Sequence, residues 1–328
     1  MKQNPVGNTE VSLSSIGLGG AWLGGQIDQK ESFDILDYAL EKGITYLDTA
    51  ESYGDGMSER VIGNWMYQRG CRDKITVLTK FTQFQEDAAG WGSREYIRNA
   101  LEASLARLRT DYVDIYMMHV PDHTVLIEET LSTLTEEMKA GKVRSIGFSN
   151  CTALQLQEAL TTSASGGYQR FEVLQPEYSL AMPPDAYGVT APLLNLPGLY
   201  EIEDGVFPIC QRENIATTTW SPLAGGFLTG QYARGTAIPE GSRAAHNTLF
   251  VGRLLTERNF QILDKLYAKA DELGMSIYNL AMAWVMSHPA VTSTIAGARR
   301  LEHIDNALEA AEVKLDPSVR AEMAAWLR

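Results

Sequence analysis

The segment Ile44-Thr45-Tyr46-Leu47-Asp48 is a short apolar run that ends in an ionisable residue. Two later segments repeat this pattern, because residues 75–79 run into Lys80 and residues 113–118 run into His119. Steps of 32 and 39 residues separate the three end residues, which leaves room each time for a loop, a helix and the next strand. In a (β/α) barrel the C-terminal ends of the strands face one mouth, where active sites are found. We therefore expect Asp48, Lys80 and His119 to converge there.

Helix and strand signals alternate along the rest of the chain, and the strands are short and apolar, as a parallel sheet covered by helices requires. The predicted fold is a single α/β domain over residues 1–328, a (β/α)8 TIM barrel with an N-terminal β-hairpin through residues 11–13. Barrels of this kind typically have about 250 residues plus insertions. The predicted strands cover residues 16–19, 44–48, 75–80, 113–118, 143–148, 171–175, 215–220 and 291–295.

Polar residues before apolar stripes of helical spacing predict where several helices begin. The expected N-terminal residues are Ser32, Ser58, Ser93 and Thr152, and a further helix is expected near residues 126–139. Residues 179–198 and 221–250 interrupt this rhythm as long loops at the C-terminal face. Loops of such length within a compact domain are usually functional or disordered, and their apolar content favours ordered lids.

The bulk composition excludes several classes of partner. The net charge is −13, from 28 basic and 41 acidic residues, and no basic block occurs, which argues against nucleic acid and anionic membranes. No apolar run approaches the roughly 20 residues of a membrane helix. The three cysteines are scattered and the N-terminus lacks an apolar leader, so we expect a cytoplasmic protein with reduced thiols. The oligomeric state stays open.

Tyr53 follows Asp48 closely and completes a possible proton-transfer set with Lys80 and His119. Considered singly, each of these residues could have a structural role, as a turn residue, a helix cap or a half-buried packing residue. Taken together they suit acid catalysis, because a tyrosine with a reference pKa of about 10 needs a nearby cation to act as an acid. Lys80 would lower that pKa, Asp48 would hold Lys80 in place, and His119 would polarise a carbonyl oxygen.

This set and further motifs along the chain resemble those of the aldo-keto reductases. The matching motifs run in the same order as in that family, from about residue 10 to residue 311, and look most similar to the bacterial and potassium-channel-β-subunit-like branches. The resemblance rests on Asp48-Thr-Ala-Glu-Ser-Tyr53-Gly54, Leu78-Thr-Lys80-Phe, Tyr116-Met-Met-His119, Gly141-Lys-Val-Arg-Ser-Ile-Gly-Phe-Ser149-Asn150, Leu174-Gln175-Pro-Glu-Tyr178, Trp220-Ser-Pro-Leu-Ala-Gly-Gly-Phe-Leu-Thr-Gly230 and Ile295-Ala-Gly-Ala-Arg299.

The resemblance implies an NADPH-dependent oxidoreductase that reversibly reduces an aldehyde or ketone to an alcohol, with Tyr53 as general acid and no metal. NADPH would be preferred over NADH because Arg299, with Arg300 beside it, would meet the 2′-phosphate. The implied contacts are Ser149, Asn150 and Gln175 with the carboxamide, Trp220 with the nicotinamide ring, Ser221, Leu223 and Gly225 with the pyrophosphate, and Gly297, Arg299, His303 and Asn306 with the adenosine end. Trp22 belongs to the same cofactor set.

The small-molecule carbonyl substrate is not identified, although Trp22, Phe84, Trp91 and Tyr187 could line an aromatic pocket. One alternative is a catalytically slow regulatory subunit that senses a nicotinamide nucleotide. Another is a metal-dependent hydrolase, but Pro121 between His119 and His123 makes a helical zinc pair unfavourable. A Gly-x-Gly-x-x-Gly dinucleotide fingerprint also fails, because Trp22 stands at the last glycine.

Overall fold

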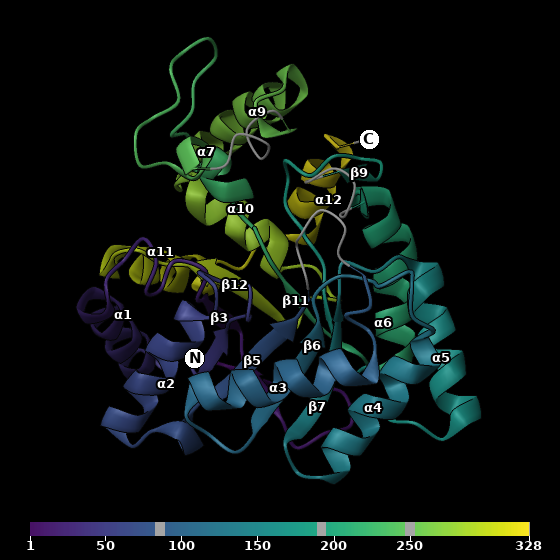
Figure 1. Ribbon diagram of the computed structural model, residues 1–328. Helices are drawn as coiled ribbons and strands as arrows, with labels where there is room; N and C mark the ends of the chain where they lie inside the picture. The colour runs from purple at the N-terminus through teal and green to yellow at the C-terminus, as the bar shows by residue number, and fades with distance from the viewer. Residues whose placement is uncertain (83–88, 189–194, 247–252, 328) are drawn as a thin grey trace.

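Eight parallel strands form a closed barrel in the computed structural model, which describes residues 1–82, 89–188, 195–246 and 253–327 (Figure 1). Neighbours around the barrel run in the order β11-β12-β3-β4-β5-β6-β7-β8. The (β/α)8 fold is thereby confirmed. The strands are β3 (Ile16–Gly19), β4 (Tyr46–Asp48), β5 (Thr76–Phe81), β6 (Val113–Met118), β7 (Val143–Ser149), β8 (Val173–Gln175), β11 (Ala216–Thr219) and β12 (Ser293–Gly297).

Side chains from these strands and from an N-terminal hairpin fill the barrel interior. β1 (Gln3–Pro5) pairs antiparallel with β2 (Ser12–Ser14), as the sequence predicts. Val6 and Leu13 of this hairpin are fully buried in one apolar cluster with inward-facing barrel residues such as Tyr46 and Leu78. The hairpin therefore closes the floor of the barrel.

Helices pack around the barrel and bury a second, larger apolar layer that contains Trp65 and Trp284. The order of strands and helices around the barrel can be followed in Figure 1. The helices are α1 (Gln29–Glu41), α2 (Met57–Arg69), α3 (Arg94–Leu108), α4 (Ile127–Lys139), α5 (Ala153–Gly166), α6 (Phe207–Glu213), α9 (Glu257–Leu273), α10 (Ile277–Met286), α11 (Leu301–Glu312) and α12 (Pro317–Ala325).

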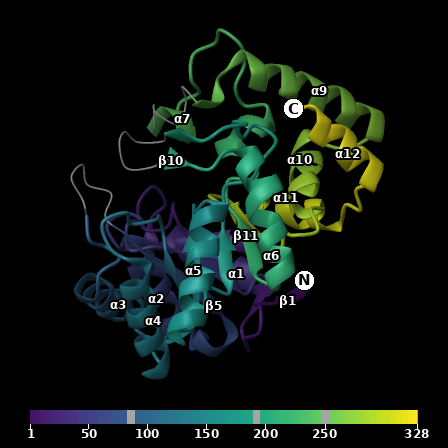
Figure 2. The same cartoon turned by 90° about the vertical axis from the view of Figure 1, so that its right-hand side faces the viewer.

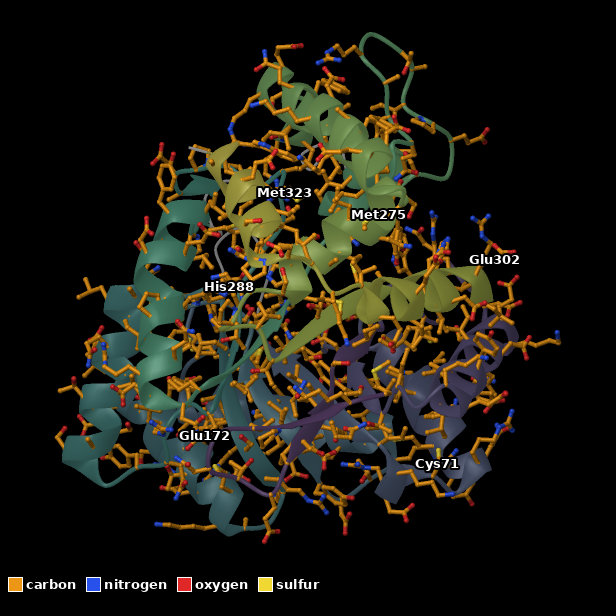
Figure 3. All side chains as sticks on the ribbon, turned by 180° about the vertical axis from the view of Figure 1, so that it is seen from behind. Cys71, Glu172, Met275, His288, Glu302 and Met323 are labelled. Carbon is orange, nitrogen blue, oxygen red and sulfur yellow. The ribbon has the colours of Figure 1, made fainter. Side chains whose placement is uncertain are left out.

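The extra elements gather at one end of the molecule. Figures 1 and 2 show α7 (Arg243–His246), α9 and the short sheet of β9 (Tyr187–Gly188) and β10 (Asn195–Leu196) beyond the barrel strands. Figure 3 shows Glu172, which precedes β8, near the end of the molecule opposite Met275 and Met323. The long connections contain secondary structure that their sequences do not predict, including η3 (Ala224–Thr229).

Two of the four predicted helix starts are correct. Ser93 and Thr152 each accept a hydrogen bond from the third residue of the following helix. Ser32 is wrong, because Asp28 caps α1 and Ser32 lies inside that helix, where its hydroxyl donates to the carbonyl of Asp28. Ser58 is also wrong, because α2 begins after Gly56, and Ser58 instead donates to the carbonyl of Gly20 at the barrel.

A close approach of α2 and α3 gives a test of this packing. A Cβ atom at Gly63 would lie 2.4 Å from the carbonyl oxygen of Arg107. Gly63→Ala should lower the free energy of unfolding by about 1–3 kcal/mol through overpacking, although alanine favours helix formation. Urea denaturation measures this, with the exposed Gln68→Ala on α2 as the control. Unchanged or increased stability of Gly63→Ala would contradict the close approach.

Candidate active site

A buried ion pair lies at the mouth of the barrel. The ammonium of Lys80, at the end of β5, donates to Asp48 Oδ1 of the neighbouring β4 over 2.7 Å and to the carbonyl of Thr49 over 2.9 Å. Both side chains are almost completely removed from solvent. Isolated charges are costly in such a place, so each must be held by the other and by further hydrogen bonds. Burial opposes the charged form of Lys80, but Asp48 and Tyr53 outweigh it and raise the lysine pKa.

Tyr53 stands above this pair on the connection between β4 and α2. Its hydroxyl lies 3.4 Å from Lys80 Nζ, and the ammonium lies 5.0 Å from the centre of its ring. Burial raises the pKa of Tyr53, while the charges of Lys80 and Arg243 act in the opposite direction. Lys80 does act to lower the pKa of Tyr53, as the sequence predicts, but loss of hydration outweighs it and the pKa lies above its usual value. The phenol is protonated at neutral pH and able to donate.

His119 completes the group from the loop that follows β6. Its ring meets that of Tyr53 edge to face, with centroids 5.9 Å apart. Burial, and secondarily the charge of Lys80, lowers the imidazole pKa well below its usual value. His119 is therefore neutral at pH 7 and can donate a hydrogen bond without adding charge. The structure thus brings Tyr53 together with the three residues that the strand spacing predicts at the mouth.

Polar side chains at the ends of β7, β8 and β11 form a connected set next to His119. The Ser149 hydroxyl donates to the carbonyl of Gln175, and the Asn150 amide donates to the carbonyl of His119. The indole N–H of Trp220 donates to Asn150 Oδ1 over 3.1 Å. Asn150 has a left-handed backbone (φ 59°), which turns its side chain across the mouth. Four residues expected at the nicotinamide therefore lie together.

The backbone after β11 is turned into left-handed conformations. Ser221, Ala224, Gly225 and Gly226 have φ values of 57°, 48°, 60° and 92°. The φ of 92° at Gly226 is a backbone conformation that favours glycine, because side chains on L-residues rarely adopt it. Such turned backbones can bring amide groups close to an anion, which suits the pyrophosphate expected at Ser221, Leu223 and Gly225.

Trp22 lies within cation–π distance of two arginines. The guanidinium of Arg299 is 4.9 Å from its ring and that of Arg243 is 5.4 Å away. Gly297, at the end of β12, lies beside the indole, since a Cβ atom there would be in ordinary contact 3.6 Å from Trp22 Nε1. Sequence reasoning missed Arg243, because a single arginine inside a long connection has no pattern that distinguishes it.

The expected adenosine contacts are only partly assembled. Nδ1 of His303 accepts a hydrogen bond from the backbone N–H of Arg299 over 3.2 Å, whereas Asn306 is exposed further along α11. The Arg299 guanidinium donates to the carbonyl of Gly241 over 2.7 Å, which ties the end of β12 to the long connection before α7.

One of the four residues expected to line an aromatic pocket lies in the packed interior. Trp91 is buried beneath the loop after β6, where its indole N–H donates to the carbonyl of Val120. It is therefore part of the packing rather than an open wall. Phe84 and the side chain of Tyr187 lie outside the described residues.

The described residues also bear on metal binding and on membrane insertion. No group of three or more His, Cys, Asp or Glu side chains there is arranged to hold a metal ion. Likewise, none of the described helices combines the length and apolar character that crossing a membrane requires.

Comparison with known proteins identifies the family. The family model described as "Aldo/keto reductase family" matches residues 15–328. The chain is 33% identical to a probable voltage-gated potassium channel subunit beta of Arabidopsis thaliana, over 95% of this chain and 92% of that protein. It is 31% identical to the uncharacterized oxidoreductase YrpG of Bacillus subtilis, over 97% and 94% respectively.

A third relative is the aryl-alcohol dehydrogenase [NADP(+)] of Phanerodontia chrysosporium, with 28% identity over 94% of this chain and 79% of that protein. A family match that covers nearly the whole chain agrees with the closed barrel and with the motifs at its mouth. The chain belongs to the aldo/keto reductase family and is an NAD(P)H-dependent aldo-keto reductase.

Proposed function

We propose that this protein, acting as one domain over residues 1–328, reduces an aldehyde or ketone to an alcohol with NADPH, and that Tyr53 is the general acid. The observation that carries the proposal is the position of Lys80 Nζ, 2.7 Å from Asp48 Oδ1 and 3.4 Å from the Tyr53 hydroxyl. The ammonium stabilises the phenolate that forms when Tyr53 gives up its proton. Proton transfer to a developing alkoxide is the step that reduction of a carbonyl requires.

The other residues at the mouth have separate tasks in this proposal. Neutral His119 donates a hydrogen bond to the substrate carbonyl oxygen and keeps that oxygen within reach of Tyr53. Ser149, Asn150, Gln175 and Trp220 hold the nicotinamide end of the cofactor, which supplies the hydride when bound. Ser221, Leu223 and Gly225 hold the pyrophosphate, and Trp22, Gly297, Arg299, His303 and Asn306 line the adenosine end.

Preference for NADPH follows from the charges at the start of α11. Arg300 precedes the helix and is exposed, and Arg299 lies just before it at the end of β12. Cations at a helix N-terminus oppose the helix dipole, and a bound anion would relieve that conflict. A guanidinium also pairs well with a phosphate. The 2′-phosphate of NADPH supplies such an anion, and NADH does not.

A second candidate function is a regulatory subunit that binds the nucleotide and turns over slowly. The identity to a probable potassium channel subunit beta favours it. The intact group of Asp48, Tyr53, Lys80 and His119 favours catalysis instead. Turnover of purified protein with a panel of carbonyl compounds, followed by NADPH absorbance, separates the two functions.

Replacement of the proton donor tests the proposal. Tyr53→Phe should reduce kcat by about 10²–10⁴-fold, the usual contribution of general acid catalysis, and leave the Kd of NADPH close to the wild-type value. Tyr67→Phe, at an exposed tyrosine of α2, is the control and should retain full activity. A Tyr53→Phe enzyme that keeps most of its kcat would exclude Tyr53 as the acid.

Replacement of Arg299 tests the cofactor preference. Arg299→Ala should weaken NADPH binding by about ten- to a hundredfold, as expected for loss of a charged hydrogen bond, and should weaken NADH binding much less. Quenching of protein fluorescence measures both constants, and Arg212→Ala on α6 serves as an exposed arginine control. Equal losses for the two cofactors would refute the contact with the 2′-phosphate.

A further inference from the structure

Asp48 is held from two sides of the barrel. Its Oδ1 accepts from Lys80, while its Oδ2 accepts from the Gln175 amide over 2.7 Å and from the Tyr46 hydroxyl over 3.2 Å. Gln175 reaches it from β8, which is not a neighbour of β4 in the barrel. Tyr46 stands two residues before Asp48 on the same strand, so both side chains point inward.

The hydrogen bonds around Tyr46 orient its proton. The Thr218 hydroxyl on β11 donates to the Tyr46 oxygen over 3.3 Å, and the Gln175 amide lies 3.4 Å from the same oxygen. Because these donors occupy the acceptor side of the phenol, its own proton is directed to Asp48. Burial, and next the charge of Asp48, raises the pKa of Tyr46 well above its usual value, so Tyr46 remains a donor throughout the working pH range.

The barrel provides space for this phenol. Gly17 on β3 is the register partner of Tyr46, and a Cβ atom at Gly17 would lie 2.3 Å from the ring carbon Cδ1. Any larger residue at Gly17 would displace the ring. Tyr46 is itself fully buried among the interior apolar side chains, so its hydroxyl reaches Asp48 from below the mouth.

We infer that Tyr46 is a positioning residue for the reduction, which through its hydrogen bond to Asp48 sets the strength of Tyr53 as an acid. The inference rests on the proposed function, in which Tyr53 gives the proton. Tyr46 touches neither the substrate nor the cofactor in this account. It acts through Asp48 and Lys80.

The sign of the effect follows from the charges that face Tyr53. These are the ammonium of Lys80, the carboxylate of Asp48 and the guanidinium of Arg243, with neutral His119 against the ring. The Tyr46 hydroxyl points its positive end at Asp48 and so offsets part of the negative potential. Removal of that hydroxyl makes the potential at Tyr53 more negative, which disfavours the phenolate and raises the pKa of Tyr53.

The experiment compares Tyr46→Phe with Tyr116→Phe. Both tyrosines are fully buried on barrel strands, but the Tyr116 hydroxyl faces the carbonyl of Ile97 on α3, away from the mouth. In Tyr46→Phe the alkaline fall of kcat/KM should move up by about half to one pH unit, and kcat at neutral pH should fall about three- to tenfold. Tyr116→Phe should keep the wild-type profile.

The melting temperature and the Kd of NADPH, measured on the same samples, separate positioning from folding. A purely structural role would lower the melting temperature without moving the pH profile, and that result would overturn the inference. If Tyr46→Phe does not fold, Thr218→Val takes its place, because it removes the donor that orients the phenol. It should shift the profile in the same direction by a smaller amount, and an unchanged profile would again overturn the inference.

Tyr53→Phe, measured alongside, distinguishes failure of the role of Tyr46 from failure of the proposed function. Loss of turnover in Tyr53→Phe together with an unshifted profile in Tyr46→Phe overturns only the role of Tyr46. Retained turnover in Tyr53→Phe overturns the proposed function, and the inference falls with it.

Discussion

The ion pair between Lys80 and Asp48 is the interaction on which the mouth of the barrel depends. Neither charge is stable alone at such burial, so each requires the other and a complete set of hydrogen bonds. Asp48 obtains donors from β4, β5 and β8, and Lys80 reaches the backbone of Thr49 as well. This mutual dependence fixes one geometry and places an ammonium beside the Tyr53 hydroxyl.

The closed barrel is what makes that geometry possible. Residues distant in sequence meet because parallel strands deliver their C-terminal ends to one rim. The interior hairpin and the Gly17–Tyr46 contact fill the space below, so the polar groups rest on a packed apolar layer. Arg243 of α7 and Arg299, just after β12, both lie over the ring of Trp22, which adds positive charge in a protein of net charge −13.

The sequence alone predicts the barrel and the convergence of Asp48, Lys80 and His119, because strand spacing determines which side chains end at the rim, and Tyr53 follows Asp48 closely. It does not predict what happens across the barrel. The contacts of Tyr46 with Thr218 and of Gln175 with Asp48 join non-neighbouring strands, and no local pattern encodes them. Ser32 and Ser58 mislead for a related reason, since tertiary contacts bury them and other residues begin the helices. The net pKa of Tyr53 also depends on burial, which sequence spacing does not reveal.

The most direct test of the central claim is the turnover of Lys80→Met, in which an apolar chain of similar length replaces the ammonium. With folding checked by circular dichroism and NADPH binding by fluorescence, the account predicts a fall in kcat of at least about 10²-fold, because the phenolate of Tyr53 loses its stabilising charge. A folded, cofactor-binding Lys80→Met enzyme with near wild-type kcat would contradict it.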